Sequence, residues 1–121
     1  MSKFRFEDIE IWELAIEILD MCMEIADILE QAHLYRFAEQ LRASGLSISN
    51  NIAEGSGSNS DNEFNKFLNY SRHSAFEVAN ITIYLIHKKL IGSDWKPKMI
   101  DKLDILCRKI TNFQKTLKRI K

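Results

Sequence analysis

Apolar residues recur along most of this 121-residue chain at the spacing of an α-helix. Placed on a wheel of about 100° per residue, they predict four helices over residues 9–30, 34–54, 61–90 and 95–119. One proline and four glycines are too few for the many turns of a β-rich protein. Short connections make successive helices antiparallel neighbours. We therefore expect one all-α domain over residues 1–121, an antiparallel up-down-up-down four-helix bundle.

The first predicted helix is apolar over well over half of its circumference, which is more than one core contact requires. Its acidic residues fall on one narrow stripe. One apolar face contains Trp12, Ile16, Leu19 and Met23. The other apolar face contains Leu14, Ile18, Met21, Ile25 and Ile28. We expect the first face to join the core and the second to contact a neighbouring subunit.

The second and third predicted helices carry features that concern packing. Ala38, Gly45 and Ser49 are small residues beside the core face of residues 34–54, where they let a neighbouring helix approach closely. Glycine inside a helix costs about 1 kcal/mol relative to alanine, and close packing would explain Gly45. Alternatively, Ser44 and Gly45 mark a kink in the helix. The helix over residues 61–90 has a second apolar stripe that includes Phe76 and Ile83. We expect this stripe to meet the surplus face of the first helix in another subunit.

The most polar part of the chain, residues 47–60, connects two predicted helices. It lacks the lysine and the preceding strand of a phosphate-binding P-loop. Gly55 is predicted to end its helix in the left-handed conformation, and Ser60 is predicted to cap the next helix. Asn51 and Glu54 are expected to fasten this end of the bundle, with Arg42 or Glu77 as partners.

The chain has no net charge, but its charges are segregated. Residues 1–30 carry two basic and nine acidic groups, whereas residues 91–121 carry nine basic and three acidic groups. The two ends can pair within one fold, or the basic end can face RNA or DNA. The candidate nucleic-acid-binding residues are Lys98, Lys102, Arg108, Lys109, Lys115 and Arg119.

The sequence contains no recognisable catalytic or metal-binding pattern. His33, His73 and His87 have no paired nucleophile or ligand spacing, so we expect no enzymatic activity, no metal site and no cofactor. Cys22 and Cys107 lie among apolar residues, as buried thiols do in the reducing cytoplasm. No apolar run approaches the roughly 20 residues of a membrane span.

Three groups of residues resemble one known family. The first two are the segments 6–12, FEDIEIW, and 51–55, NIAEG. The third is the series Ser60, Glu63, Phe64, Phe67, Leu68, Arg72, Ser74 and Glu77. Together they resemble the four-helix bundle proteins encoded in intervening sequences of 23S ribosomal RNA genes. The accessory variability determinant of diversity-generating retroelements is similar to this family. The segments 40–42, QLR, and 47–48, SI, lead into NIAEG and belong to the same resemblance. The polar residues of the motif are Arg42, Asn51, Glu54, Ser74 and Glu77.

The resemblance implies a homo-oligomer, typically a pentameric barrel, with a role in binding nucleic acid or a nucleic-acid enzyme. It implies no catalytic activity. Our leading interpretation is therefore a cytoplasmic, non-enzymatic, homo-oligomeric scaffold that binds RNA or DNA. The alternative is a protein–protein adaptor, for example to a reverse transcriptase, without direct contact to nucleic acid.

Overall fold

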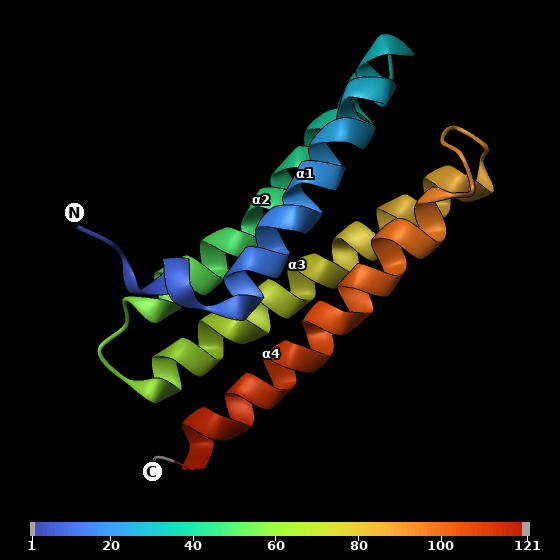
Figure 1. The fold of residues 1–121 in the computed structure, drawn as a ribbon. Helices are drawn as coiled ribbons and strands as arrows, with labels where there is room; N and C mark the ends of the chain where they lie inside the picture. The colour runs from blue at the N-terminus through green and yellow to red at the C-terminus, as the bar shows by residue number, and fades with distance from the viewer. Residues whose placement is uncertain (1, 120–121) are drawn as a thin grey trace.

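The computed structural model describes residues 2–119, which form helices and no strand (Figure 1). A short 3₁₀ turn, η1, precedes the first long helix, and a π turn, η2, precedes the fourth. In chain order the elements are η1 (Arg5–Asp8), α1 (Glu10–Gln31), α2 (Tyr35–Ser56), α3 (Asp61–His87), η2 (Lys96–Ile100) and α4 (Asp101–Arg119). No helix within residues 2–119 is both long and apolar enough to cross a membrane.

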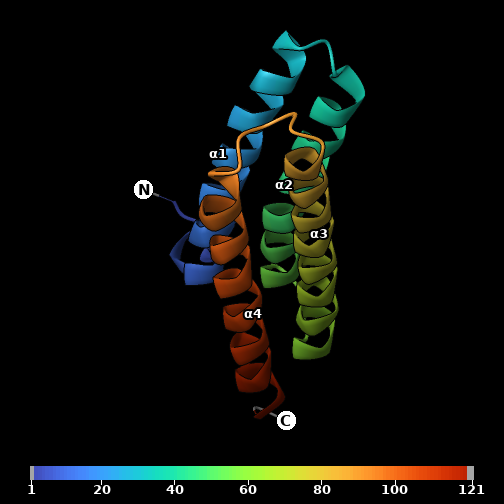
Figure 2. The same cartoon turned by 90° about the vertical axis from the view of Figure 1, so that its right-hand side faces the viewer.

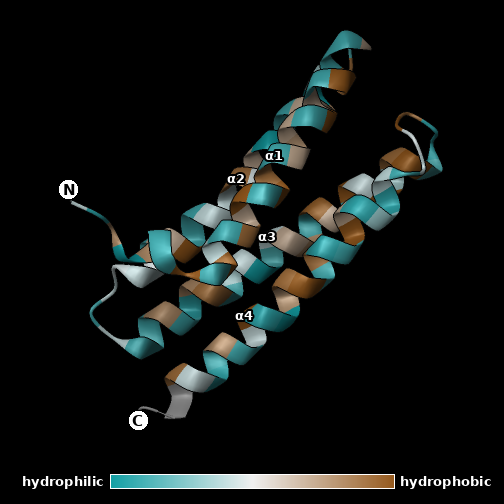
Figure 3. Ribbon diagram, in the orientation of Figure 1, coloured by the Kyte–Doolittle hydropathy of each residue, from teal (hydrophilic) through white to brown (hydrophobic). Residues whose placement is uncertain are grey.

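Each long helix packs against two others. α1 and α3 each contact both α2 and α4, and the two views in Figures 1 and 2 show the four helices grouped in this way. Hydrogen bonds between α2 and α3 join Gln40 to Glu77 and Ile48 to Ser71. Residue numbers therefore increase along α2 while the numbers of their partners decrease along α3. These two helices therefore run in opposite directions. Figure 3 shows apolar and polar positions alternating along every helix, as amphipathic helices require.

The buried face of α1 lies between the two apolar faces expected from the sequence. It consists of Ile11, Ala15, Ile18, Cys22, Ile25, Ala26 and Leu29. Ile18 and Ile25 are thus core residues of the single chain, and they are withdrawn from the expected subunit interface. Met23 was assigned to the core but is 42% exposed. The apolar arc of α1 is so wide that periodicity alone does not determine which part of it faces inward.

Gly55 does not end α2, as the sequence had suggested. The helix continues to Ser56, and no described glycine has a positive φ. Gly55 is buried instead, and a Cβ atom there would lie 2.7 Å from Phe64 Cδ1 and 2.8 Å from Phe67 Cβ. Glycine occupies this position because aromatic side chains of α3 lie directly against the α2 backbone.

Close packing also explains Gly45, as predicted. A Cβ atom at Gly45 would lie 2.9 Å from Cys22 Sγ on α1, which is closer than such atoms approach. Ala38 and Ser49 are buried on the same helix. The small residues of α2 therefore allow α1 to approach on one side, while Gly55 allows α3 to approach on the other.

The starts of α3 and α4 follow the local sequence. The Oγ atom of Ser60 accepts a hydrogen bond of 3.2 Å from the Glu63 amide, which confirms the predicted cap. The fourth predicted helix begins as the π turn η2, with Pro97 in its first positions. Proline is tolerated there because the first amides of a helix have no partner within the helix.

α1 and α3 end in the same way, and both endings are unusual. Leu34 donates its amide to Leu29 O at 2.8 Å, and Leu90 donates to Leu85 O at 2.9 Å. These are the bonds of the Schellman motif, whose left-handed residue is usually glycine. Here the left-handed residues are His33, with φ 62°, and Lys89, with φ 58°. The second motif ends α3 at His87, three residues before the predicted end.

The contact at Gly55 makes a direct prediction about stability. Gly55→Ala should lower the free energy of unfolding by about 1–3 kcal/mol, because the added methyl group overpacks the contact with Phe64 and Phe67. Gly57→Ala is the matched control, since a Cβ there would come no closer than 3.6 Å to Glu54 O. Its effect should stay within about 0.5 kcal/mol. Urea unfolding followed by circular dichroism measures both, and equal stabilities would contradict the packing argument.

Candidate interaction surfaces

Two ion pairs connect the acidic stripe of α1 to the basic face of α4. Lys102 Nζ lies 2.6 Å from Glu17 Oε1, and Lys109 Nζ lies 3.2 Å from Glu10 Oε1. Lys109, the later of the two lysines, pairs with Glu10, the earlier of the two glutamates, so α1 and α4 run in opposite directions. Exposed pairs of this kind contribute about 0–1 kcal/mol each. They favour this arrangement of helices more than they stabilise it.

Two further candidate residues of the basic end also have acidic partners. Lys98 Nζ lies 3.3 Å from Asp94 Oδ2 and 5.1 Å from the centre of the Trp95 ring. Arg108 lies 3.1 Å from Asp104 on the same helix. These contacts lower the net positive charge that α4 presents to solvent.

Lys115 is exposed and has no ion pair within the described part of the chain. Arg119 ends α4, but its side chain lies outside the described residues. Four of the six candidate nucleic-acid-binding residues therefore have an acidic partner in the same chain. Of the two interpretations of the segregated charges, pairing within the fold accounts for Lys102 and Lys109.

Glu77 and Ser74, two polar motif residues of α3, form a hydrogen-bonded seam with α2. Glu77 Oε2 accepts from Gln40 Nε2 at 2.7 Å and from Ser44 Oγ at 2.9 Å. Ser44 is buried, and a buried hydroxyl needs such a partner. Glu77 therefore satisfies two polar groups of the neighbouring helix at once.

The seam continues through Ser74, which donates to Ser47 Oγ at 2.8 Å. Asn51 Nδ2 donates to Ser47 O at 2.8 Å and to Ser47 Oγ at 3.1 Å. Asn51 thus lies beside the helix contact, but its partner is neither Arg42 nor Glu77.

Arg42 links α2 to α1 instead. Its guanidinium pairs with Glu30 and, at 2.8 Å, with Asp27. Glu54 is exposed, and its side chain makes no hydrogen bond or ion pair within residues 2–119. The expectation that Asn51 and Glu54 have Arg42 or Glu77 as a partner is therefore wrong, because Arg42 pairs with acids of α1 and Glu77 accepts from other residues of α2.

An apolar groove runs along the outer side of the contact between α3 and α4. It is lined by Ala75, Phe76, Ala79, Ile100, Leu103, Asp104 and Cys107. The side chain of Phe76 is 65% exposed. Ile83 is also exposed, and it follows Phe76 by two turns on the same side of α3. We call this surface, with Ile83, the α3/α4 groove.

A second apolar groove lies along the outer side of the contact between α1 and α2. It is lined by Leu19, Asp20, Met23, Arg42, Ala43 and Leu46. Leu46 is 46% exposed. Sequence reasoning missed Leu46, although a large apolar residue outside the core face of α2 was a usable signal. We call this surface the α1/α2 groove.

The remaining expected interface residues of α1 do not gather in one place. Leu14 and Met21 are half-buried and pack against the core. Ile28 is exposed and lies beside the connection between α3 and α4, near Ile86 and Leu90. The structure therefore separates Ile28 from the α1/α2 groove.

The two grooves lie on opposite sides of the molecule. α1 and α2 form one pair in Figure 1, and α3 and α4 form the other. The pairs meet through the α2–α3 and α1–α4 contacts. One chain therefore presents two different apolar surfaces that face away from each other.

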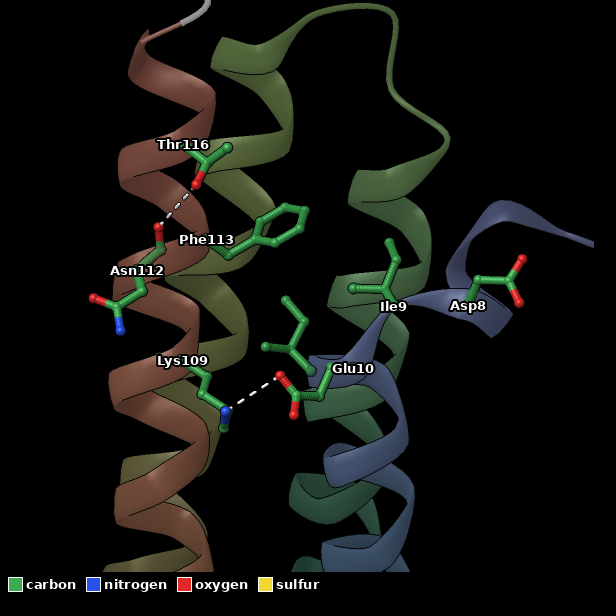
Figure 4. A pocket seen from close by; sticks show the side chains of 8 residues that line it. Asp8, Ile9, Glu10, Lys109, Asn112, Phe113 and Thr116 are labelled. Carbon is green, nitrogen blue, oxygen red and sulfur yellow. Dashed lines mark hydrogen bonds and ion pairs between the residues drawn. The ribbon is translucent and has the colours of Figure 1, made fainter.

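An open cleft lies between the start of α1 and the last turns of α4 (Figure 4). It is lined by Asp8, Ile9, Glu10, Ile11, Lys109, Asn112, Phe113 and Thr116. Lys109 pairs with Glu10 across the cleft, and Asp8 pairs with Lys3 at 2.7 Å. Because these charges are already matched, the cleft does not offer a site for an ionic ligand.

The two thiols occupy different surroundings. Cys22 is fully buried between α1 and α2, and burial raises the pKa of its thiol to about 12. Cys107 is half-buried in the α3/α4 groove, and burial raises its pKa as well. Within the described residues, no three His, Cys, Asp or Glu side chains are placed to hold a metal ion.

Comparison with known proteins connects the chain to one group. The family model described as 23S rRNA-intervening sequence protein matches residues 7–112. The match includes all of α1, α2 and α3 and the first part of α4. The searches of curated proteins and of solved structures returned no match.

The polar seam makes a prediction that separates its members from other motif residues. Glu77→Ala should lower the free energy of unfolding by about 1–3 kcal/mol, because it leaves Ser44 without its partner. Asn51→Ala should cost about 1 kcal/mol through the lost hydrogen bonds to Ser47. Glu54→Ala is the control, and its effect should stay within about 0.5 kcal/mol. Thermal and urea unfolding measure these differences, and three equal stabilities would remove the seam as a structural feature.

Proposed function

Because the chain belongs to the 23S rRNA-intervening sequence protein family, we propose that it is a non-enzymatic, homo-oligomeric scaffold. In this proposal the four helices form an up-down-up-down bundle, and the bundles assemble into a ring. The observation that carries the proposal is the presence of two unlike apolar grooves on opposite sides of one chain.

The difference between the grooves supports a head-to-tail assembly. A contact that joins two copies of the same surface closes as a dimer, whereas a contact between two different surfaces continues from copy to copy. Such a chain of contacts forms a ring when the rotation between copies closes. The family resemblance in the sequence suggests five subunits, and we propose a pentamer.

The exposed side chains indicate which surfaces would meet. Phe76 and Ile83 project from the α3/α4 groove, and Met23 and Leu46 project from the α1/α2 groove. Contiguous exposed apolar surface on a small protein marks an interaction site. We propose that Phe76 and Ile83 of one subunit pack against Met23 and Leu46 of the next.

Nucleic-acid binding explains the basic face of α4 less well than pairing with the acids of α1 does. Lys102 and Lys109 would have to leave Glu17 and Glu10 before they could contact phosphate. An adaptor for a nucleic-acid enzyme, such as a reverse transcriptase, is the alternative to self-assembly. In that case the same grooves hold a different protein, and the purified chain stays monomeric.

A mixing experiment tests the head-to-tail contact. Phe76→Glu and Met23→Glu each place a charge in one groove and leave the other intact, so each variant alone should be monomeric. Mixed in equal amounts, they should form a dimer through the one pair of intact grooves. Sedimentation velocity at micromolar concentration measures the species against the 14.1 kDa monomer.

Ile105→Glu is the matched control for this experiment. Ile105 is exposed on α4 but lies between Lys102 and Lys109, on the side that faces α1. This variant should assemble like the wild type. A monomeric wild type would contradict the proposal, and so would a Met23→Glu variant that remains a dimer, since that result requires a contact between like surfaces.

Cys107 provides a second test in the wild-type protein. If a neighbouring subunit covers the α3/α4 groove, alkylation of Cys107 at pH 8 should be slow in the assembled protein and faster in Phe76→Glu. Cys22 is the internal reference, because its buried thiol, with a pKa of about 12, should react slowly in both. Mass spectrometry of the alkylated peptides gives both rates. Equal Cys107 rates in the two proteins would show that the groove is not covered.

A further inference from the structure

Aromatic and basic side chains, all exposed except the half-buried Phe37, lie where α1 and α3 end and α2 begins. None of these residues belongs to the basic face of α4 or lines either apolar groove. Lys89 lies near Ile28, beside the connection between α3 and α4. We call the cluster the aromatic–basic patch: His33, Tyr35, Arg36, Phe37, Tyr84, His87, Lys88 and Lys89.

The rings of the patch are arranged next to one another. Phe37 on α2 and Tyr84 on α3 stack with their centroids 6.1 Å apart and their planes 18° apart. The His87 ring lies 6.4 Å from the Tyr84 ring. Tyr84 remains 45% exposed, so the stack is open to a further flat group.

A second pair of rings stands at the start of α2. His33 and Tyr35 lie 5.8 Å apart, and a hydrogen bond of 2.7 Å joins His33 Nδ1 to the Tyr35 hydroxyl. This bond holds the two side chains in a fixed relation although Tyr35 is 56% exposed. The patch thus has two positioned pairs of rings, in which Tyr35 and Tyr84 are exposed and Phe37 also packs against the core.

The cations of the patch differ from those of α4. Arg36, Lys88 and Lys89 are exposed and form no ion pair within residues 2–119. Of the nearby carboxylates, Glu30 is held by Arg42, and Glu39 lines the same shallow hollow as Arg36. Basic groups therefore outnumber free carboxylates here, in a chain whose net charge is zero.

The backbone adds an independent observation. His33 and Lys89 adopt left-handed conformations in which glycine would cost less. Non-glycine residues in such conformations concentrate at functional sites, where their side chains are needed despite the strain. Both residues occur at this end of the molecule.

We propose that the aromatic–basic patch binds single-stranded nucleic acid. Bases stack on the exposed faces of Tyr84 and Tyr35, while Arg36, Lys88 and Lys89 contact the phosphates. Surfaces that combine stacking rings with unpaired cations bind single strands with little regard to sequence. A duplex keeps its bases stacked inside, so it can use the cations but not the rings. Neither apolar groove contains these rings or Arg36, so binding does not depend on the proposed assembly.

Fluorescence anisotropy with a labelled oligouridine tests the proposal, with oligothymidine and a duplex of equal length as comparisons. Tyr84→Ala should weaken binding of the single strands by about fivefold or more, and Tyr84→Phe should bind like the wild type. Tyr70→Ala is the matched control, because Tyr70 is an exposed tyrosine elsewhere on α3. It should leave the affinity unchanged.

The cations are tested by salt dependence. The double variant Arg36→Gln, Lys88→Gln should reduce the slope of log affinity against log salt by about 1.4, at about 0.7 per phosphate contact. Lys98→Gln, Lys115→Gln is the control on α4 and should leave the slope unchanged. Lys89→Gly should raise the melting temperature, by relieving the left-handed strain, and weaken binding.

Three results would overturn the proposal. The protein does not bind the oligonucleotides, it binds duplex and single strand with equal affinity, or its affinity does not change with salt concentration. Loss of binding in the α4 double variant alone would place the site on α4 instead. Equal binding of an acidic peptide, lost in the Arg36, Lys88 variant, would identify a protein partner. The same measurements in Phe76→Glu separate this proposal from the proposed assembly, since the patch is intact there.

Discussion

The close approach of α2 to both of its neighbours is the constraint on which the other contacts depend. Gly45 lets Cys22 of α1 lie against the helix backbone, and Gly55 does the same for Phe64 of α3. Hydrogen bonds across the seam, such as the 2.8 Å contact between Ser74 and Ser47, form only if the backbones stay this close. Larger residues at these positions would push the helices apart and leave polar groups without partners, which costs more than the bonds contribute.

The pairing of charges inside the chain decides which surfaces remain for partners. Glutamates of α1 form ion pairs with Lys102 and Lys109. These lysines of the basic helix α4 are therefore less available to an anionic partner. Three unpaired cations, Arg36, Lys88 and Lys89, lie instead at the aromatic–basic patch. The exposed apolar residues Phe76, Met23 and Leu46 lie at the two grooves. The proposed self-assembly and the proposed nucleic-acid binding thus use different parts of one small bundle. A ring would repeat the patch around its circumference, and repeated weak sites bind a long strand more tightly than one site does.

The outcome for individual residues shows what periodicity can and cannot predict. The four helices were predicted because a spacing of 3.6 residues needs only local sequence. The close packing at Gly45 and the cap at Ser60 were predicted for the same reason. Gly55 was misread, because glycine serves equally as a helix end and as a place for close approach. Only the position of Phe64 and Phe67 against its backbone separates these uses.

The sequence by itself determined the four amphipathic helices, the segregation of charge and the family to which the chain belongs. These depend on residue types and on spacing along the chain. The tertiary structure decided which part of the wide apolar arc of α1 became core, since Ile18 faces inward and Met23 does not. It also brought Tyr84 beside Phe37 and paired Lys102 with Glu17, residues that are far apart in sequence. Such contacts depend on the rotation and register of each helix against its neighbours. Those are set by the packing of all four helices together, and no segment of the chain encodes them alone.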